Sequence, residues 1–266
     1  MKILFIGDII ARIGRRAVKT LLPSLISKYN IDFISANGEN SAGGFGITEK
    51  TAIELFDMGV HVITTGNHVW DKKDIIPFIS QQTRLIRALN YPPGVPGVGS
   101  TVYSIKNGLK VGVINLSGRV FMTAVDCPFR AVLPEIEKIK KETNIILVDF
   151  HAEATSEKRA MGYHLNGHVS AVVGTHTHVQ TADECVLSGR TAYITDVGMT
   201  GPKDSVIGVN ISQIINKFLT QMPTKYEIAR GAVVLCGVVI DIDEVDGFAR
   251  GITRIAETIN PEALCN

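Results

Sequence analysis

Residues 2–8 of the chain read KILFIGD, an apolar run that ends in a glycine and a carboxylate. The run has the composition of a buried strand, so Asp8 follows directly after the strand's carboxyl end. Further apolar runs are followed in the same way by side chains that can bind a metal ion. These runs are DFISA (32–36), HVITT (61–65), NIILV (144–148) and SAVV (170–173). Because ligands of α/β proteins bind outside the carboxyl ends of strands, the repetition predicts one polar crevice.

Helical patterns separate the first three of these runs. Apolar residues recur at helical spacing from Gly14 to Tyr29, and Thr48 is placed to cap a second helix. Residues 71–74 (DKKD) are a plausible start for a third helix that runs to Ser80. This β-α-β-α-β order predicts a parallel sheet at the centre of the fold.

The rest of the chain predicts antiparallel pairs. TVYSI (101–105) and KVGVINL (110–116) flank Asn107-Gly108, a strong hairpin signal. A helix is predicted from about Ala131 to Thr143, and a second hairpin-like region fills residues 226–257. The mixture of parallel and antiparallel pairing predicts an α/β fold with two packed mixed sheets and helices outside them. With no repeat and no linker, residues 1–266 are expected to form one domain.

Composition narrows the classes of partner. The chain has 266 residues, 27 basic and 26 acidic, and a net charge of +1, so no stable binding to nucleic acid is expected. Cys127, Cys185, Cys236 and Cys265 form no C-x-x-C pair, which is typical of a reducing compartment. The first residues lack a signal peptide, and no apolar run is long enough to span a membrane. The expected location is the cytoplasm, and a homo-oligomer remains open.

The polar residues at the strand ends suit a metal centre. Carboxylate, carboxamide and imidazole groups bind iron, manganese or zinc, and the lack of cysteine ligands argues against a structural zinc site. Glu39 ends a central strand, and its two oxygens are suited to bridging two ions about 3.5–4 Å apart. His176 and His178 would share one face of an extended segment and serve one ion each. His68, next to Asn67, is placed to protonate a leaving oxygen.

The motifs together resemble the calcineurin-like metallophosphoesterases, and most closely their YmdB-like bacterial branch. The matching segments cover nearly the whole chain: ILFIGD (3–8), NGENSAGGFGIT (37–48), TTGNHVWDKK (64–73), VDFHAEATSEK (148–158), VVGTHTHVQTAD (172–183) and TAYITDVGMTGP (191–202). The resemblance implies a four-layer α-β-β-α sandwich. It also implies hydrolysis of cyclic nucleotides, chiefly 2′,3′-cyclic forms, with 3′,5′-cyclic AMP as a further substrate.

The resemblance also implies roles for individual residues. One metal ion would be held by Asp8, Glu39, Asn40 and His178, and the other by Glu39, Asn67, His151 and His176. His68 would be the proton donor to the leaving oxygen after attack by a metal-bridging hydroxide, and iron is the implied metal, with manganese as an alternative. The wider superfamily usually opens with D-x-H, whereas Ile9 and Ile10 follow Asp8 here. Asn40 would take the place of the missing histidine.

Two other functions are compatible with these residues. An amidohydrolase also uses an H-x-H pair, but on an early strand, whereas His176 and His178 come late. A metal-binding regulatory protein that senses a nucleotide, or that acts through an RNA-processing partner, would show binding with little turnover. The scarcity of cationic residues within the metal motifs favours a phosphodiester over a phosphomonoester substrate.

Overall fold

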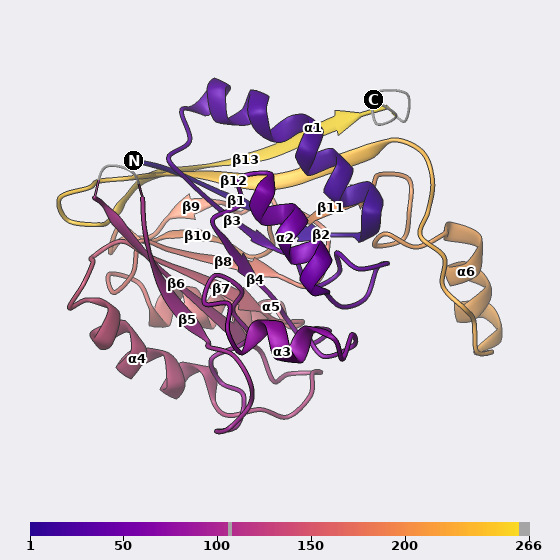
Figure 1. Cartoon of the computed structure of the whole chain (residues 1–266), viewed down its shortest axis with the longest axis horizontal. Coiled ribbons are helices and arrows are strands. Elements are labelled where there is room, and N and C mark those ends of the chain that lie inside the picture. The colour runs from indigo at the N-terminus through magenta and orange to yellow at the C-terminus, as the bar shows by residue number, and fades with distance from the viewer. Residues whose placement is uncertain (106–107, 261–266) are drawn as a thin grey trace.

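Two mixed β-sheets form the centre of the protein (Figure 1). The computed structural model describes residues 1–105 and 108–260. In spatial order the first sheet contains β2 (Asp8–Ile9), β11 (Met199–Pro202), β12 (Val233–Ile242), β1 (Lys2–Ile6), β3 (Phe33–Asn37) and β4 (Val62–Thr64), and β13 (Ala249–Ile259) pairs with β12. The second sheet contains β5 (Ser100–Ser104), β6 (Lys110–Ser117), β7 (Ile146–His151), β8 (Ala171–Thr175), β10 (Ala192–Ile194) and β9 (Cys185–Val186).

Each sheet has a parallel centre, as the alternation of strand and helix predicts. β1, β3 and β4 run parallel, and so do β6, β7, β8 and β10. Both predicted hairpins are confirmed, because β5 pairs antiparallel with β6 and β12 pairs antiparallel with β13. Asn107, in the predicted turn, and Cys265 lie outside the described residues.

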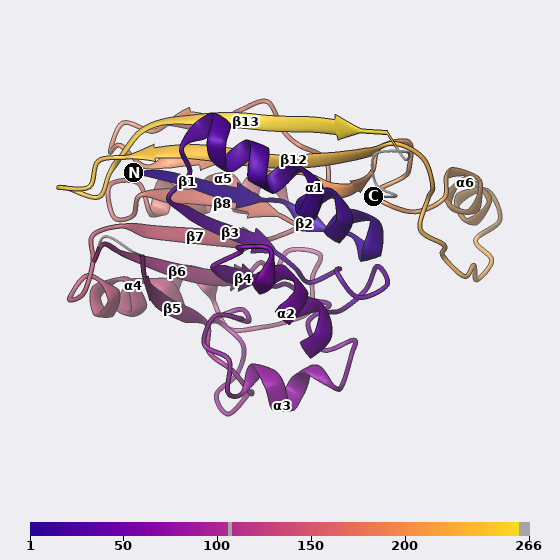
Figure 2. The same cartoon turned by 45° about the horizontal axis from the view of Figure 1, so that its top comes forward.

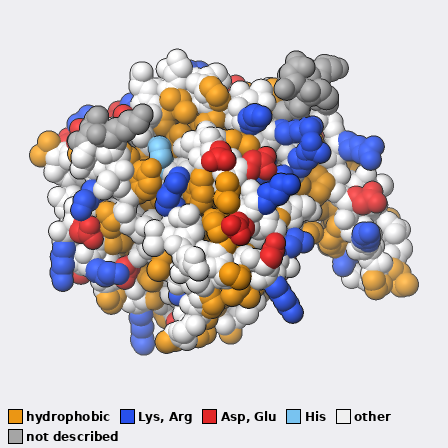
Figure 3. Space-filling view, in the orientation of Figure 1, with side chains coloured by type: hydrophobic (Ala, Val, Ile, Leu, Met, Phe, Trp, Pro, Cys, Tyr) orange, Lys and Arg blue, Asp and Glu red, His pale blue; other side chains and the backbone are white. Residues whose placement is uncertain are grey.

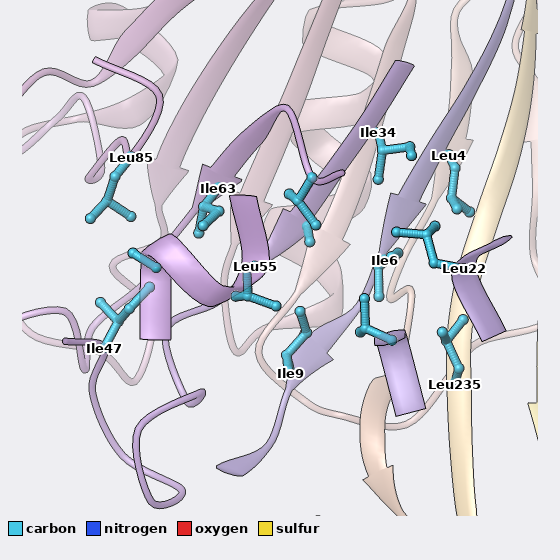
Figure 4. Packing of buried hydrophobic residues seen from close by; sticks show 14 of the residues in the cluster. Leu4, Ile6, Ile9, Leu22, Ile34, Ile47, Leu55, Ile63, Leu85 and Leu235 are labelled. Atoms are coloured by element: carbon cyan, nitrogen blue, oxygen red, sulfur yellow. The ribbon is translucent and has the colours of Figure 1, made fainter. Parts of the chain in front are cut away.

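The period-2 alternation of β1 shows how the layers are joined. Ile3 and Phe5 belong to the core between the two sheets, whereas Leu4 and Ile6 pack in the core beneath the helices. Figure 4 shows Leu4, Ile6 and the neighbouring strand residues facing Leu22 of α1. The inner strands of both sheets are therefore buried on both faces, which explains their nearly continuous apolar runs.

The helices cover the outer faces of the two sheets. On the first sheet lie α1 (Ala11–Tyr29), α2 (Glu49–Asp57) and α3 (Ile75–Ile79). The second sheet is covered by α4 (Pro128–Ile139) and α5 (Thr155–His164). The four-layer α-β-β-α sandwich is confirmed. A sixth helix, α6 (Ile211–Thr220), belongs to neither layer and projects beside the sandwich in both Figure 1 and Figure 2.

Helix boundaries depart from the sequence prediction in three places. α1 begins at Ala11, so Gly14 lies inside the helix and does not start it. A Cβ at residue 14 would come 2.3 Å from the carbonyl oxygen of Thr200, so the glycine allows the helix to pack closely against β11. α4 begins at Pro128, where a proline fits the first turn, and ends at Ile139. α3 covers only Ile75–Ile79. The cap at Thr48 is confirmed, since its hydroxyl accepts a hydrogen bond from the Thr51 backbone.

None of the helices in residues 1–105 and 108–260 has both the length and the apolar character that crossing a lipid bilayer requires.

Candidate metal centre

The carboxyl ends of strands from both sheets meet at one buried cluster. His151 Nε2 lies 3.1 Å from Glu39 Oε1, 3.1 Å from Asn67 Oδ1 and 3.0 Å from His176 Nδ1. The ligand atoms of Glu39, His151 and His176 all lie within 4.8 Å of one another. Glu39 and His151 are fully buried. Four residues far apart in the sequence thus present oxygen and nitrogen atoms to one small volume, which is the arrangement of a metal site.

A second group of ligand-type atoms adjoins the first. His178 Nε2 lies 3.8 Å from Asp8 Oδ1 and 3.4 Å from Asn40 Nδ2. Asn40 Nδ2 in turn lies 3.2 Å from Glu39 Oε1, the same oxygen that contacts His151. Glu39 therefore contacts both groups, and the seven residues named from the sequence as ligands lie close together at this edge of the two sheets.

Two buried oxygens in the second group indicate that its donor set fits a cation. Oδ1 of Asp8 and Oδ1 of Asn40 are buried and take part in no hydrogen bond with the residues that the structure describes. Buried polar atoms are nearly always paired, and an ion is one of the partners that can satisfy them. A half-turn of the Asn40 amide would present its oxygen to Glu39 and His178, an arrangement that a cation between them would favour.

The ionisation of the cluster is set by burial and by close charges. Burial alone would raise the pKa of Glu39, but the neighbouring His151 lowers it to about 2. Burial alone would lower the pKa of His151, but Glu39 and Asp8 raise it to about 9. Burial and the positive charge of His151 lower the pKa of His176 to about 3. A metal ion bound in this cluster would compete with a proton for the same histidine nitrogen.

A buried chain of hydrogen bonds orients His151. Its Nδ1 lies 2.8 Å from Thr175 Oγ1, and the Thr175 hydroxyl donates to Asp149 Oδ1 at 2.7 Å. Burial raises the pKa of Asp149 to about 7. When Nδ1–H donates to Thr175, the lone pair of Nε2 points at Glu39 and Asn67, as a metal-ligating histidine requires. In the sequence, the only sign of this hydrogen-bonded chain is that Asp149 and Thr175 are polar residues within otherwise apolar strands.

The His176-Thr177-His178 segment is a turn and not the extended segment that the sequence predicted. β8 ends at Thr175, and the φ angles of His176 and His178 are 99° and 64°. The turn is held by Asp196 Oδ2, which accepts hydrogen bonds from the Thr177 backbone N–H at 3.1 Å and the Thr177 hydroxyl at 2.7 Å. The extended-strand explanation is therefore wrong, although both imidazoles do reach the cluster.

Charged residues around this turn also contact the site. The buried Lys158 Nζ lies 2.7 Å from Asp196 Oδ2, so it neutralises the carboxylate that holds the turn. Glu153 Oε2 lies 3.0 Å from His176 Nε2, which leaves His176 Nδ1 facing His151. Glu153 and Lys158 both lie in the VDFHAEATSEK segment (148–158), but nothing local in that segment indicates their contacts with His176 and Asp196.

His68 lies at the edge of the cluster with its ring half-buried. Its backbone N–H donates to Glu39 Oε2 at 3.0 Å, and its Nδ1 lies 2.9 Å from Asp71 Oδ2. The contact with Asp71 orients the ring and leaves Nε2 as the nitrogen available to a bound molecule. The Phe45 ring packs edge-on against His68, with ring centroids 5.1 Å apart.

The backbone approaches the cluster most closely at Gly66. A Cβ at this position would lie 2.2 Å from His151 Nε2 and 2.5 Å from Glu39 Oε2. Only glycine leaves room for those two side chains, which accounts for the glycine of the GNH motif.

Two further aromatic residues near these motifs lie outside the site. His61 Nδ1 accepts a hydrogen bond from the Ile34 backbone at 2.9 Å, and its ring stacks on Phe33. Trp70 packs edge-on against Tyr91, with ring centroids 6.0 Å apart. Both are structural residues.

A cavity of about 270 Å³ opens beside the cluster. Glu39, Asn40, His68, His176 and His178 line one end of it. The remaining wall is apolar except for the Tyr226 hydroxyl. It is formed by Ile10, Gly44, Phe45, residues 206–209, Ile214 and Phe218 of α6, Tyr226 and Ile228. Apart from Phe45, which lies in the NGENSAGGFGIT segment (37–48), the apolar residues of this wall carry no sequence signal of a binding site.

The cavity wall and the cluster are joined through the backbone of Ile207. The carbonyl oxygen of Ile207 lies 3.1 Å from His178 Nδ1. Ile207 has a φ of 48°, a conformation that is unusual for a β-branched residue. The bond to Nδ1 leaves His178 Nε2 facing Asp8 and Asn40.

Comparisons with known proteins agree over the length of the chain. A family model described as YmdB-like protein matches residues 4–255. The 2′,3′-cyclic-nucleotide 2′-phosphodiesterase of Bacillus subtilis (strain 168) is 50% identical over 255 residues, which cover 96% of this chain and 96% of that protein. A hypothetical protein from Thermus thermophilus, known from its crystal structure, is 38% identical, with a TM-score of 0.90 and coverage of 97% of this chain and 99% of that one. A novel phosphatase from Mycoplasma pneumoniae is 33% identical, with a TM-score of 0.91 and coverage of 100% and 96%.

Proposed function

The chain belongs to the YmdB-like family, and on that basis we propose that it is a metal-dependent phosphodiesterase that hydrolyses nucleoside 2′,3′-cyclic phosphates. The observation that carries the proposal is the contact of Glu39 Oε1 with both groups of ligand-type atoms, at 3.1 Å and 3.2 Å. The activity named for the Bacillus subtilis relative, at 50% identity, supports the choice of substrate. A secondary activity on 3′,5′-cyclic AMP is part of the same proposal.

Two metal ions, iron or alternatively manganese, are the proposed cofactors. Asp8, Glu39, Asn40 and His178 would hold one, and Glu39, Asn67, His151 and His176 the other. Bound there, such ions would neutralise phosphate oxygens and lower the pKa of water. The core that the two sheets share supports the companion proposal that the chain folds as one domain.

His68 is the proposed proton donor of the reaction. The oxygen of water bonds to phosphorus, the bond between phosphorus and O2′ breaks, and the proton of His68 goes to O2′, which leaves a nucleoside 3′-phosphate. The proton that the water loses goes to solvent, from which His68 is protonated again. Asp71 supports this role because its carboxylate, 2.9 Å from Nδ1, orients the ring. The Nε2 atom is then the donor to the substrate.

The lining of the cavity favours a diester over a monoester. No lysine or arginine among the described residues lines it. A monoester carries up to two negative charges and benefits from an arginine that pairs with the second, whereas a diester carries one.

An assay panel tests the proposal on protein whose metal content has been measured by elemental analysis. We expect about two ions per chain, clear hydrolysis of 2′,3′-cyclic nucleotides and slower release of phosphate from nucleoside monophosphates. Comparable or faster monophosphate hydrolysis would overturn the proposed substrate class. Binding of cyclic nucleotides without turnover would instead support a regulatory protein.

A further inference from the structure

We infer that the apolar end of the cavity binds the base of the cyclic nucleotide by contact with its faces and does not distinguish one base from another by hydrogen bonding. This inference rests on the proposed function. It assigns Phe218 and Tyr226 as the residues that determine how strongly a base is held.

The cavity has the position and size for this role. The candidate ligands line one end of this single cavity, and Phe218, Tyr226 and Ile228 line the other. A phosphate at the ligand end would therefore direct the rest of the substrate toward the apolar wall. The volume of about 270 Å³ is near the lower limit of about 300 Å³ for small-molecule sites, so the cavity suits one mononucleotide.

The chemistry of the wall identifies which part of the nucleotide it would bind. Apart from the candidate ligands and His68, Tyr226 is the only described lining residue with a polar side-chain atom. The bases differ in their hydrogen-bonding edges but share flat, weakly polar faces. Stacking on aromatic side chains is tolerant of base identity for this reason. The wall therefore suits any base and offers little to discriminate among them.

Phe218 lies on α6, and Tyr226 lies on a segment that is tethered to this helix. Lys217 Nζ lies 5.4 Å from the centroid of the Tyr226 ring, and the Gln213 side chain accepts a hydrogen bond from the Glu227 backbone at 2.8 Å. Both contacts attach α6 to the segment that carries Tyr226. Phe218 lines the cavity yet is 72% exposed, so a bound base would cover an aromatic surface that now faces water.

The neighbouring residue supplies a matched control. Leu219 is 80% exposed on the same helix but does not line the cavity. Figure 3 shows hydrophobic side chains gathered at the tip of the projecting lobe that holds α6. Removing either side chain takes a comparable apolar group from the surface, but only Phe218 would contact a base.

The test measures kcat and KM with the metal-loaded protein for five cyclic esters. These are the 2′,3′-cyclic phosphates of adenosine, guanosine, cytidine, uridine and methyl riboside, which keeps the ribose and the reacting ring but has no base. We expect similar kcat/KM for adenosine and guanosine and somewhat lower values for the pyrimidines. Methyl riboside should have a kcat/KM about 5- to 100-fold lower than adenosine, the range expected for stacking of one base.

The variants locate the effect. Phe218→Ala should raise KM for the adenosine ester about fivefold, at the low end of that range because the ring is partly exposed, with kcat unchanged. The same variant should leave the methyl riboside ester unaffected, and Leu219→Ala should alter neither substrate. Tyr226→Ala should act as Phe218→Ala does, and Tyr226→Phe should retain the wild-type values.

Several results would overturn the inference while leaving the proposed function intact. One is equal kcat/KM for the methyl riboside and adenosine esters. Another is a tenfold or greater preference between adenosine and guanosine, which would require hydrogen bonding to the base. A third is an equal effect of Phe218→Ala and Leu219→Ala, which would indicate that α6 acts through another contact, such as a second copy of the chain. Absence of turnover of all five esters would overturn the proposed function and this inference together.

Discussion

The two ends of the cavity are built in different ways. At the ligand end, Asp8 and Glu39 are fully buried and lie two residues beyond the ends of β1 and β3, which are inner strands of the first sheet. At the apolar end, α6 contains no buried residue, and Phe218 and Leu219 are largely exposed. The reacting groups are therefore fixed by the core of the fold, whereas the recognition surface is an addition at its periphery. Substitutions at the first end should abolish activity, and those at the second should only adjust it.

The largest effect should follow from Glu39→Gln. A neutral amide cannot hold two cations as a carboxylate does, so both ions should be lost or weakened together. Activity should fall by more than about 100-fold, the upper range for groups that only support a metal ligand. Elemental analysis and turnover of a 2′,3′-cyclic nucleotide measure the two effects.

The matched control is Glu49→Gln, an exposed glutamate in the first turn of α2, which should keep both metal and activity. If Glu39→Gln protein carried a full complement of two ions, Glu39 would not be the bridge. The ligand end would then tolerate change as the apolar end does.

The ligand end could be predicted from sequence because each of its parts is local. A buried strand followed by Asp8, Glu39, Asn67 or His151 can be recognised in a few residues, and parallel strands bring their carboxyl ends to one edge. The conformation of His176 and His178 could not, because Asp196 holds that turn from a distant segment. The cavity wall also depends on tertiary contacts: the β-bridge between Val209 and Ile228 joins segments that have no pairing signal in the sequence.

A smaller effect is expected for His68→Ala, which tests whether the ligand end separates binding from chemistry. Turnover should fall about 10²- to 10⁴-fold, the usual contribution of general acid catalysis. Metal content should persist, because the contact of residue 68 with Glu39 is made by its backbone N–H. The loss should shrink for a nitrophenyl phosphodiester, whose leaving group needs no proton. If the variant purified without metal, His68 would be a ligand and the assignment of roles would be wrong.

The smallest effect is expected for Ile207→Gly, at the point where the two ends meet. The Ile207 carbonyl contacts His178 Nδ1, and this contact belongs to the backbone. Glycine adopts a φ of 48° without strain, so the substitution should relieve about 1–3 kcal/mol of backbone strain in the folded state. The greater conformational entropy of glycine in the unfolded chain should cancel about 0.5–1 kcal/mol of this gain in stability. The free energy of unfolding should therefore rise by no more than about 2.5 kcal/mol, with metal content unchanged. Loss of the apolar side chain should raise KM for a cyclic nucleotide modestly. If the variant instead lost one metal ion, the side chain of the wall would be supporting His178, and the two ends of the cavity would not be separable as their burial suggests.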